Sequence, residues 1–263
     1  MEEDVVIQFS GIDSWSKYAK YVRKIASELE EPIFRGQSNK FRNTGYSGWR
    51  LEPSLYRIPQ TSHPRFIDWV NTIFTDTECQ NVIAKTVGRN VNKDVDEDGE
   101  VVIGLMRHLG LPTPLLDWTK NPFVAAYFAF ESIHETTEGV SIFLFDQKAW
   151  LTNENPLTSR DMEILKLQEL EHIIPRQKAQ ESIYTYSRNE RVYSELLGDE
   201  LEGGDYFIAY CTLPIHDREK ALKDLRKIGI YYDSLFPDEK EVEEMKNSLH
   251  DLMKGLSNFN HST

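Results

Sequence analysis

The chain has 263 residues and a net charge of −13, so its surface repels phosphate backbones and general nucleic-acid binding is not expected. Its longest apolar run, at 123–130, is far too short to cross a bilayer. The acidic N-terminus offers no signal-peptide n-region, and Cys79 and Cys211 have neither metal-ligand nor disulfide spacing. We therefore expect a cytoplasmic protein with reduced thiols, without a metal site and without membrane contact.

Apolar residues at helical spacing predict most of the helices. In chain order the expected helices span residues 15–29, 64–87, 101–109, 121–130, 161–172, 217–228 and 238–256, with a short helix or turn at 191–197. Asp13 or Ser14 is placed to cap the first of them, and Gly110 and Gly229 are typical of helix C-termini. Polar, glycine-containing loops are expected at 38–48, 90–100 and 152–160, the second of them exposed and mobile.

Short apolar runs between these helices predict strands. The expected strands lie at residues 5–9, at 33–34 leading into Arg35, at 140–146 and at 205–213, with an extended segment at 49–56 and a mixed one at 176–186. Because the elements show no regular βαβ alternation, the pattern indicates an α+β fold with one domain. We expect a mixed, mostly antiparallel central sheet flanked by helices. The expected organisation is a lead-in at 1–31, the domain at 32–256 and a disordered tail at 257–263.

The stretch at residues 105–130, LMRHLGLPTPLLDWTKNPFVAAYFAF, is the most informative part of the chain. It places Asp117, Trp118 and Thr119 between an apolar pair and a helix that begins near Pro122. Polar groups held between apolar elements ahead of a helix N-terminus often line a pocket. The alternatives are a helix cap for Asp117 and Thr119, and a place in the core for Trp118.

Other candidate site residues lie on either side of this stretch. Arg35 follows two apolar strand residues and offers a permanent planar charge for phosphate or carboxylate; the alternative is a strand-end arginine paired with a structural acid. Gly36 allows a ligand or another backbone to approach closely. His108 ends a helix, where a histidine is more often a structural hydrogen-bonder than a catalyst. Gln180 and Glu181 begin a partly apolar segment and could also form a solvated turn.

Motifs spread along the chain resemble the FRG domain family, whose name comes from the triplet at 34–36. The matching residues are FRGQ at 34–37, LEPSL at 51–55 with Arg57, HLGLPT at 108–113, LLDWT at 115–119, Pro122 with the alanines and phenylalanine at 125–129, Arg176, Ala179 and Gln180, and SLFPD at 234–238. The resemblance extends over most of residues 34 to 252.

The order of these motifs is similar to that of the ADP-ribosyltransferase fold. In that fold an arginine or histidine on an early strand is followed by a Ser/Thr-bearing strand, a helix with alanine and aromatic residues, and a late Glu or Gln. The resemblance implies NAD as the substrate, with Arg35, Thr119 and Gln180 or Glu181 as the catalytic residues. Because adjacent strand residues point to opposite faces, only one of that last pair can enter the pocket. The ligand-binding residues implied are Gly36, Gln37, His108, Asp117, Trp118 and Tyr184.

Three functions follow from these observations and stay open. The first is an enzyme that transfers ADP-ribose from NAD to a macromolecule, or hydrolyses NAD, in the setting of a toxin or an anti-phage effector. Here a carboxylate would stabilise an oxocarbenium-like ribose and Arg35 would hold phosphate or ribose oxygens. The second is a non-catalytic module that binds a nucleotide or another anion. The third is an effector that acts through a protein partner.

Overall fold

A computed structural model describes residues 3–38, 51–57, 64–133, 138–152, 162–187 and 207–238, together with positions 240, 242–244 and 247. Contacts within the chain divide it into two compact units. The sheet unit comprises Met1–Glu52, Leu116–Ile164 and Gln180–Leu235. The helical unit comprises Pro53–Leu115, Leu165–Ala179 and Phe236–Thr263.

Six strands form the sheet of the first unit, in the order β4-β5-β2-β1-β3-β6. Their bounds are β1 Ile33–Gln37, β2 Leu115–Thr119, β3 Gly139–Phe145, β4 Met162–Leu165, β5 Ser182–Ser187 and β6 Ile208–Pro214. Strands β1, β3 and β6 form an antiparallel ladder along their whole length. Within the described residues, β2 pairs antiparallel with β1 through Phe34 and Thr119. The expected α+β class with a mostly antiparallel sheet is confirmed.

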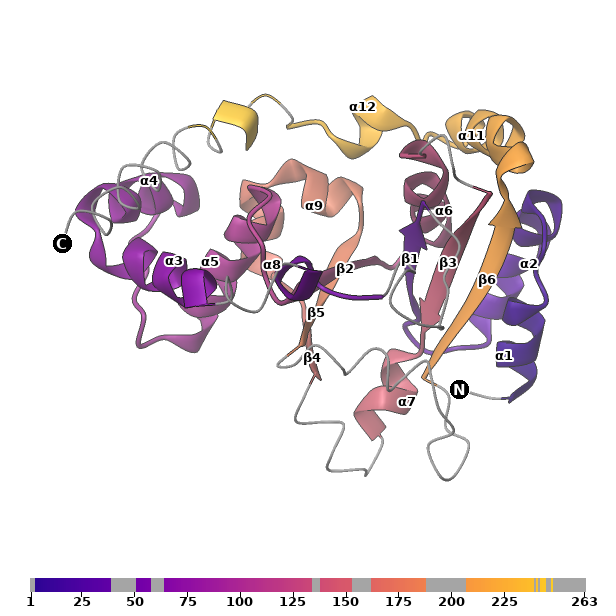
Figure 1. Ribbon diagram of the computed structural model, residues 1–263, viewed down its shortest axis with the longest axis horizontal. Helices are drawn as coiled ribbons and strands as arrows, with labels where there is room; N and C mark the ends of the chain where they lie inside the picture. Colours follow the sequence, from indigo (N-terminus) through magenta and orange to yellow (C-terminus); the bar gives the residue numbers. More distant parts are fainter. Residues whose placement is uncertain are drawn as a thin grey trace. The chain divides into compact units, whose positions relative to one another are not determined.

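Helices cover one face of the β1–β3–β6 ladder. The helices of the sheet unit are α1 Glu3–Ser10, α2 Trp15–Ser27, α6 Pro122–Glu131, α7 Gln147–Thr152, η3 Ile215–Asp217, α11 Arg218–Lys227 and α12 Tyr232–Leu235. Helix α6 packs on β1 and β3, and α1 packs on β6 (Figure 1). The sequence of α6 is apolar almost all round, as a helix between a sheet and other helices requires. Asn121 begins it, because its side chain accepts a hydrogen bond from the Phe123 N–H.

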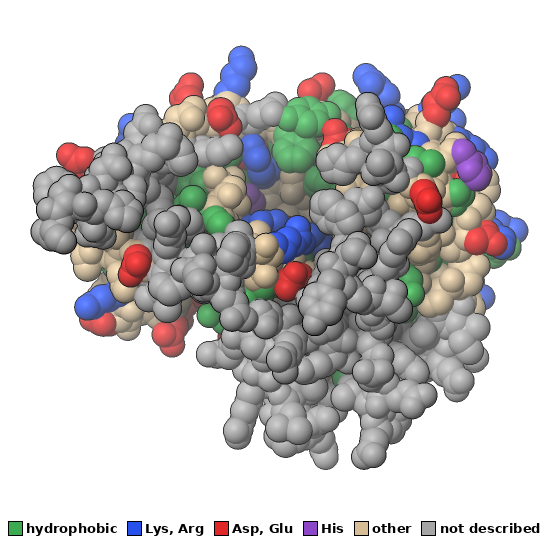
Figure 2. Space-filling model, viewed as in Figure 1, with side chains coloured by type: hydrophobic (Ala, Val, Ile, Leu, Met, Phe, Trp, Pro, Cys, Tyr) green, Lys and Arg blue, Asp and Glu red, His purple; other side chains and the backbone are tan. Residues whose placement is uncertain are grey.

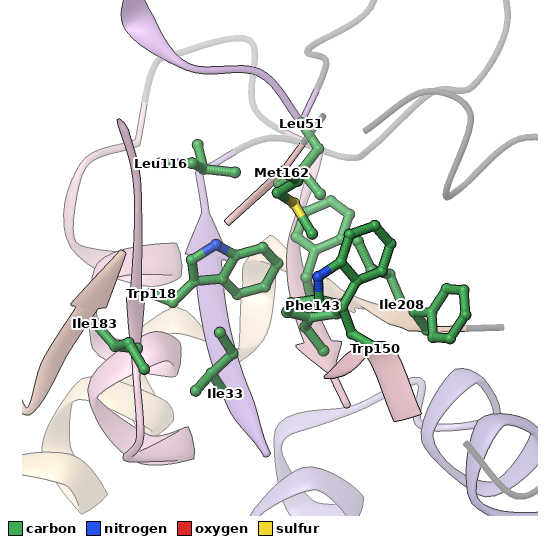
Figure 3. Close-up of a cluster of buried hydrophobic side chains, with 11 residues drawn as sticks. Ile33, Leu51, Leu116, Trp118, Phe143, Trp150, Met162, Ile183 and Ile208 are labelled. Atoms are coloured by element: carbon green, nitrogen blue, oxygen red, sulfur yellow. The ribbon is translucent and has the colours of Figure 1, made fainter. Parts of the chain in front are cut away.

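The opposite face of the sheet carries a core of its own. Figure 3 shows Ile33, Trp118, Phe143 and Trp150 gathered on this side, with side chains from several strands. The cluster comprises Ile33, Leu51, Leu116, Trp118, Phe143, Phe145, Trp150, Met162, Ile183, Phe207 and Ile208. The Trp118 ring lies 5.6 Å from that of Phe145, and Trp150 meets Phe207 edge-on at 5.4 Å. The Trp118–Phe145 contact packs β2 against the ladder, and Ile183 of β5 belongs to the same cluster.

Salt bridges around Arg89 stabilise the helical unit. Its elements are η1 Ser54–Arg57, α3 Pro64–Thr75, α4 Thr77–Val87, α5 Asp96–His108, α8 Gln168–Ile173 and α9 Pro175–Ala179. Arg89 contacts the buried Asp98 at 2.5 Å and donates two hydrogen bonds to Glu169 on α8, each at 2.8 Å. The Arg89 guanidinium holds the pKa of Asp98 below its usual value. Gly104 of α5 lets α8 approach, since a Cβ there would lie 2.4 Å from a Leu167 methyl group.

The first predicted strand is wrong, because residues 5–9 belong to helix α1. The β-branched run favours a strand, but a helix places Val5 and Phe9 one turn apart on the same side. Both side chains are buried there, and the Phe9 ring packs 6.4 Å from Phe34 on β1 and 6.5 Å from Tyr18 on α2. Tertiary packing therefore outweighs local propensity in this segment.

Four further predictions need correction. The helix expected at 64–87 is two helices, separated at Asp76, whose carboxylate caps the second by accepting from the Cys79 N–H. The loop expected at 90–100 contains the start of α5 at Asp96, where acidic residues favour a helix N-terminus. The helix expected at 161–172 is strand β4 followed by α8. The segment expected to be extended at 49–56 contains η1.

Several predictions fall outside the described residues. These are the helix or turn at 191–197, the tail at 257–263, most of the loops at 38–48 and 152–160, and most of the helix expected at 238–256. Among the described residues no helix is both long enough and apolar enough to span a membrane. The same part of the chain contains no group of His, Cys, Asp or Glu residues suited to hold a metal ion.

Candidate functional site

The two faces of β1 have different roles. On one face Phe34 and Gly36 meet the helices. A Cβ at Gly36 would lie 1.8 Å from the carbonyl oxygen of Ala125 and 2.6 Å from the backbone nitrogen of Ala129. Gly36 is thus required by the close approach of the α6 backbone, one of the two roles expected for it. By strand alternation Ile33, Arg35 and Gln37 point to the other face.

The register of the ladder shows how polarity changes along this second face. Directly paired residues of an antiparallel ladder point to the same side. Three rows therefore cross β1, β3 and β6 in turn: Ile33, Phe145 and Ile208; then Arg35, Phe143 and Tyr210; then Gln37, Ser141 and Thr212. The first row is apolar, the second carries one guanidinium and a partly exposed tyrosine, and the third is wholly polar. Polarity on this face therefore increases from the apolar core toward the row of Gln37, Ser141 and Thr212, in which Gln37 and Ser141 are buried.

Arg35 is held where β1 lies beside β2. Its Nη1 donates to the backbone carbonyl of Asp117 at 2.7 Å and lies 3.7 Å from the Asp117 carboxylate. The Arg35 side chain is only 14% exposed, whereas that of Asp117 is 38% exposed. Asp117 thereby orients the guanidinium. A guanidinium fixed in this way is pre-organised to receive an anionic or hydroxyl-bearing ligand.

Gln37, at the end of β1, is the least satisfied polar side chain of this face. It is 6% exposed, and neither its amide nitrogen nor its amide oxygen has a hydrogen-bond partner among the described residues. Buried amides are nearly always hydrogen-bonded, so an exception calls for an explanation.

Thr119 and Gln180 have structural hydrogen bonds. The Thr119 hydroxyl donates to the Gln180 carbonyl at 2.7 Å and accepts from the Asn121 N–H at 3.0 Å. The Gln180 side-chain amide donates to the carbonyl of Leu235 at 2.9 Å. Because Thr119 is paired with Phe34, its side chain lies on the helix-covered face, away from Arg35. These bonds join the end of β2 to the turn that precedes β5.

Glu181 differs from its neighbour Gln180. Its side chain is exposed, and its Oε1 accepts a hydrogen bond from the Asn121 side-chain amide at 2.8 Å. Its backbone has a φ of 48°, in the left-handed region that residues other than glycine seldom adopt. The Glu181 carbonyl accepts from the Lys120 N–H at 3.0 Å, which fixes this strained turn beside the end of β2. Strain of this kind is often found at functional sites.

The two aromatic candidates are covered by protein. Trp118 is 3% exposed and donates its indole N–H to the Thr185 hydroxyl at 2.9 Å. This places it in the core, one of the two alternatives considered for it. Tyr184 is 1% exposed. His108, the last residue of α5, is half-buried in the helical unit.

Two other motif segments come together within the helical unit. The Ser54 hydroxyl accepts from the Thr113 N–H at 3.1 Å and from an Arg107 nitrogen at 3.2 Å. The Leu55 N–H donates to the Thr113 carbonyl, which joins the LEPSL segment to the HLGLPT segment. Arg176 pairs with the buried Asp238 at 2.7 Å. The motif residues of this unit therefore stabilise its fold.

The described surface carries charges of both signs. Figure 2 shows acidic and basic side chains interspersed over the region of α2 and α11. Several are paired, as Lys17 is with Asp13 and Lys227 with Asp224. The overall negative charge is therefore no barrier to a local site for an anion around Arg35.

Residues 30–138 match the FRG domain family. This part of the chain is similar to FRG domains. The match begins just before β1 and ends after α6, so it contains Arg35, Gln37 and the Asp117–Thr119 block, whereas Gln180 and Glu181 lie beyond it. Comparison with curated proteins gives no match, and neither does comparison with solved structures. The domain boundaries expected at residues 32 and 256 stay a prediction.

Sequence reasoning missed some residues of this site. Ser141 and Thr212 complete the polar row beside Gln37, and Asn121 holds Glu181. Ser141 stands in the apolar run VSIFLF, which indicates only a buried strand. Its polar neighbours come from strands that are distant in the sequence, so the row depends on a register that no local pattern contains.

Proposed function

We propose that the chain binds NAD beside Arg35, at the neighbouring strands β1 and β2, and acts as an ADP-ribosyltransferase-like enzyme. One observation carries this proposal. The arginine strand is β1, the Ser/Thr strand before an alanine-rich helix is β2, and the Gln/Glu segment directly precedes β5. Strands β1, β2 and β5 are neighbours in the sheet. Segments more than 140 residues apart, at Arg35 and Glu181, thus both adjoin β2.

The proposed chemistry breaks the bond between the nicotinamide nitrogen and the ribose anomeric carbon. Nicotinamide leaves with the electron pair, and a nucleophile from a macromolecule or water bonds to the carbon and loses its proton. Arg35, oriented by Asp117, would hold phosphate or ribose oxygens. Glu181 supplies the carboxylate, because it is the acid among these candidates; Thr119 and Gln180 are engaged with backbone carbonyls. A carboxylate near the ribose stabilises an oxocarbenium-like transition state.

Nicotinamide release from NAD tests this proposal. Glu181→Gln keeps the size of the side chain and the backbone strain but removes the charge, so we expect the rate to fall about 100-fold or more. Glu31→Gln is the matched control, because Glu31 is also exposed and has a φ of 54°. An unchanged rate in Glu181→Gln would exclude Glu181 as the catalytic carboxylate. Absence of release by the wild-type chain, with no label transfer to proteins of a cell lysate, would refute the enzyme.

A non-catalytic nucleotide-binding module is the second candidate. It is favoured by the hydrogen bonds of Thr119 and Gln180, which place two of the four candidate catalytic side chains in structural roles. Calorimetry separates the two functions: saturable NAD binding without turnover, weakened by Arg35→Lys, supports the module. A protein target, a toxin or anti-phage role and a cytoplasmic location remain predictions from the resemblance.

A further inference from the structure

The side chain of Gln37 combines two properties that conflict in a stable protein. It is buried, and neither atom of its amide has a hydrogen-bond partner within the described part of the chain. An apolar side chain of similar size would avoid this cost altogether. Proteins often retain a destabilising polar group of this kind at a position where it serves function.

The buried glutamine of the helical unit provides a comparison. Gln177 is 1% exposed, but its amide nitrogen donates to the Leu167 carbonyl at 3.3 Å, between α8 and α9. That bond gives Gln177 a structural role. No described residue gives Gln37 an equivalent one.

The position of Gln37 indicates what a partner would look like. It stands in the polar row with Ser141 and Thr212, on the same face as Arg35. Two residues along a strand separate their Cα atoms by about 7 Å. This is similar to the distance between the phosphate of a nucleotide and its base. An anion at Arg35 would therefore bring a planar base near the Gln37 amide.

We propose that the Gln37 amide recognises a planar group with an adjacent hydrogen-bond donor and acceptor, using its own acceptor and donor in return. In NAD two groups have this chemistry, the nicotinamide carboxamide and the edge of the adenine ring. This inference rests on the proposed function, because it assigns a specificity residue to the same site.

Binding measurements on Gln37→Met test the inference, because methionine preserves volume and removes both polar atoms. We expect about tenfold weaker NAD binding, the loss that one or two hydrogen bonds produce. The melting temperature of the ligand-free protein should rise by about 2–4 °C. Asparagine keeps the amide on a side chain that is one methylene shorter. Gln37→Asn should therefore weaken NAD binding without raising the melting temperature. Gln177→Met, the matched control, should lower the melting temperature and leave NAD affinity unchanged.

ADP-ribose distinguishes the two groups, since it keeps the adenine and lacks the carboxamide. A loss of affinity in Gln37→Met for NAD alone assigns the carboxamide, and an equal loss for both ligands assigns the adenine. Wild-type affinity of Gln37→Met for both ligands, together with a lower melting temperature, would overturn this inference and leave the proposed function standing. A wild-type chain that binds neither ligand would overturn both.

Discussion

Replacing Gly36 by alanine tests how closely β1 and α6 approach. The new methyl group would lie 1.8 Å from the Ala125 carbonyl oxygen and 2.6 Å from the Ala129 nitrogen. Both are backbone atoms of a helix that is buried on nearly all sides, so no side chain can rotate away to make room. Either α6 shifts or β1 distorts.

The expected magnitude follows from overpacking. Extra methyl groups in a packed core typically cost about 1–3 kcal/mol, and contact with rigid backbone belongs at or above the upper limit. We expect Gly36→Ala to lower the free energy of unfolding by about 3 kcal/mol or more. That is a large part of the stability of an ordinary domain, about 5–15 kcal/mol.

Urea unfolding measures this change, with Gly99→Ala as the control. Gly99 lies inside α5, and a Cβ there would meet nothing within 4 Å. Because alanine favours helix more than glycine does, Gly99→Ala should stabilise by up to about 1 kcal/mol. Equal stabilities of Gly36→Ala and the wild type would refute the packing role of Gly36 and restore a direct contact with a ligand as its explanation.

Two further substitutions test structural roles. Thr119→Val removes both hydrogen bonds of the hydroxyl, so it should lower the free energy of unfolding in urea by about 1–3 kcal/mol. Thr119→Ser should have a smaller effect. Full stability of Thr119→Val with loss of nicotinamide release would instead make Thr119 catalytic. Asp98→Asn should cost about 1.5–3 kcal/mol at pH 7, because Arg89 donates to that carboxylate. Since the folded-state pKa of Asp98 is lowered, its stabilisation is complete above the unfolded value of 3.8 and is lost as the pH falls through the folded value. The difference from wild type should therefore shrink in unfolding experiments below about pH 4, and a constant difference would contradict the ion pair.

Elements with strong patterns are predictable from the sequence. The apolar runs of β3 and β6 and the apolar helix α6 stand out against their neighbours. Helix α1 does not, because its β-branched residues favour a strand and only the packing of Phe9 against other elements decides otherwise. Strand β4 has four residues, too few for a periodic signal.

The site is predictable in its residue types and not in its geometry. The triplet at 34–36 indicates Arg35, and alternation alone places Gln37 beside it on one face. The opposite orientation of Thr119 depends on its pairing with Phe34, a register between segments 85 positions apart that no local pattern determines. The hydrogen bonds that engage Thr119 and Gln180 likewise come from tertiary contacts.

The most direct test is a crystal structure of the chain with NAD bound. We expect phosphate or ribose oxygens within hydrogen-bonding distance of Arg35, the Gln37 amide paired with the carboxamide or the adenine, and the Glu181 carboxylate near the nicotinamide ribose. NAD bound away from this face of β1, or no bound nucleotide at saturating concentration, would contradict the account.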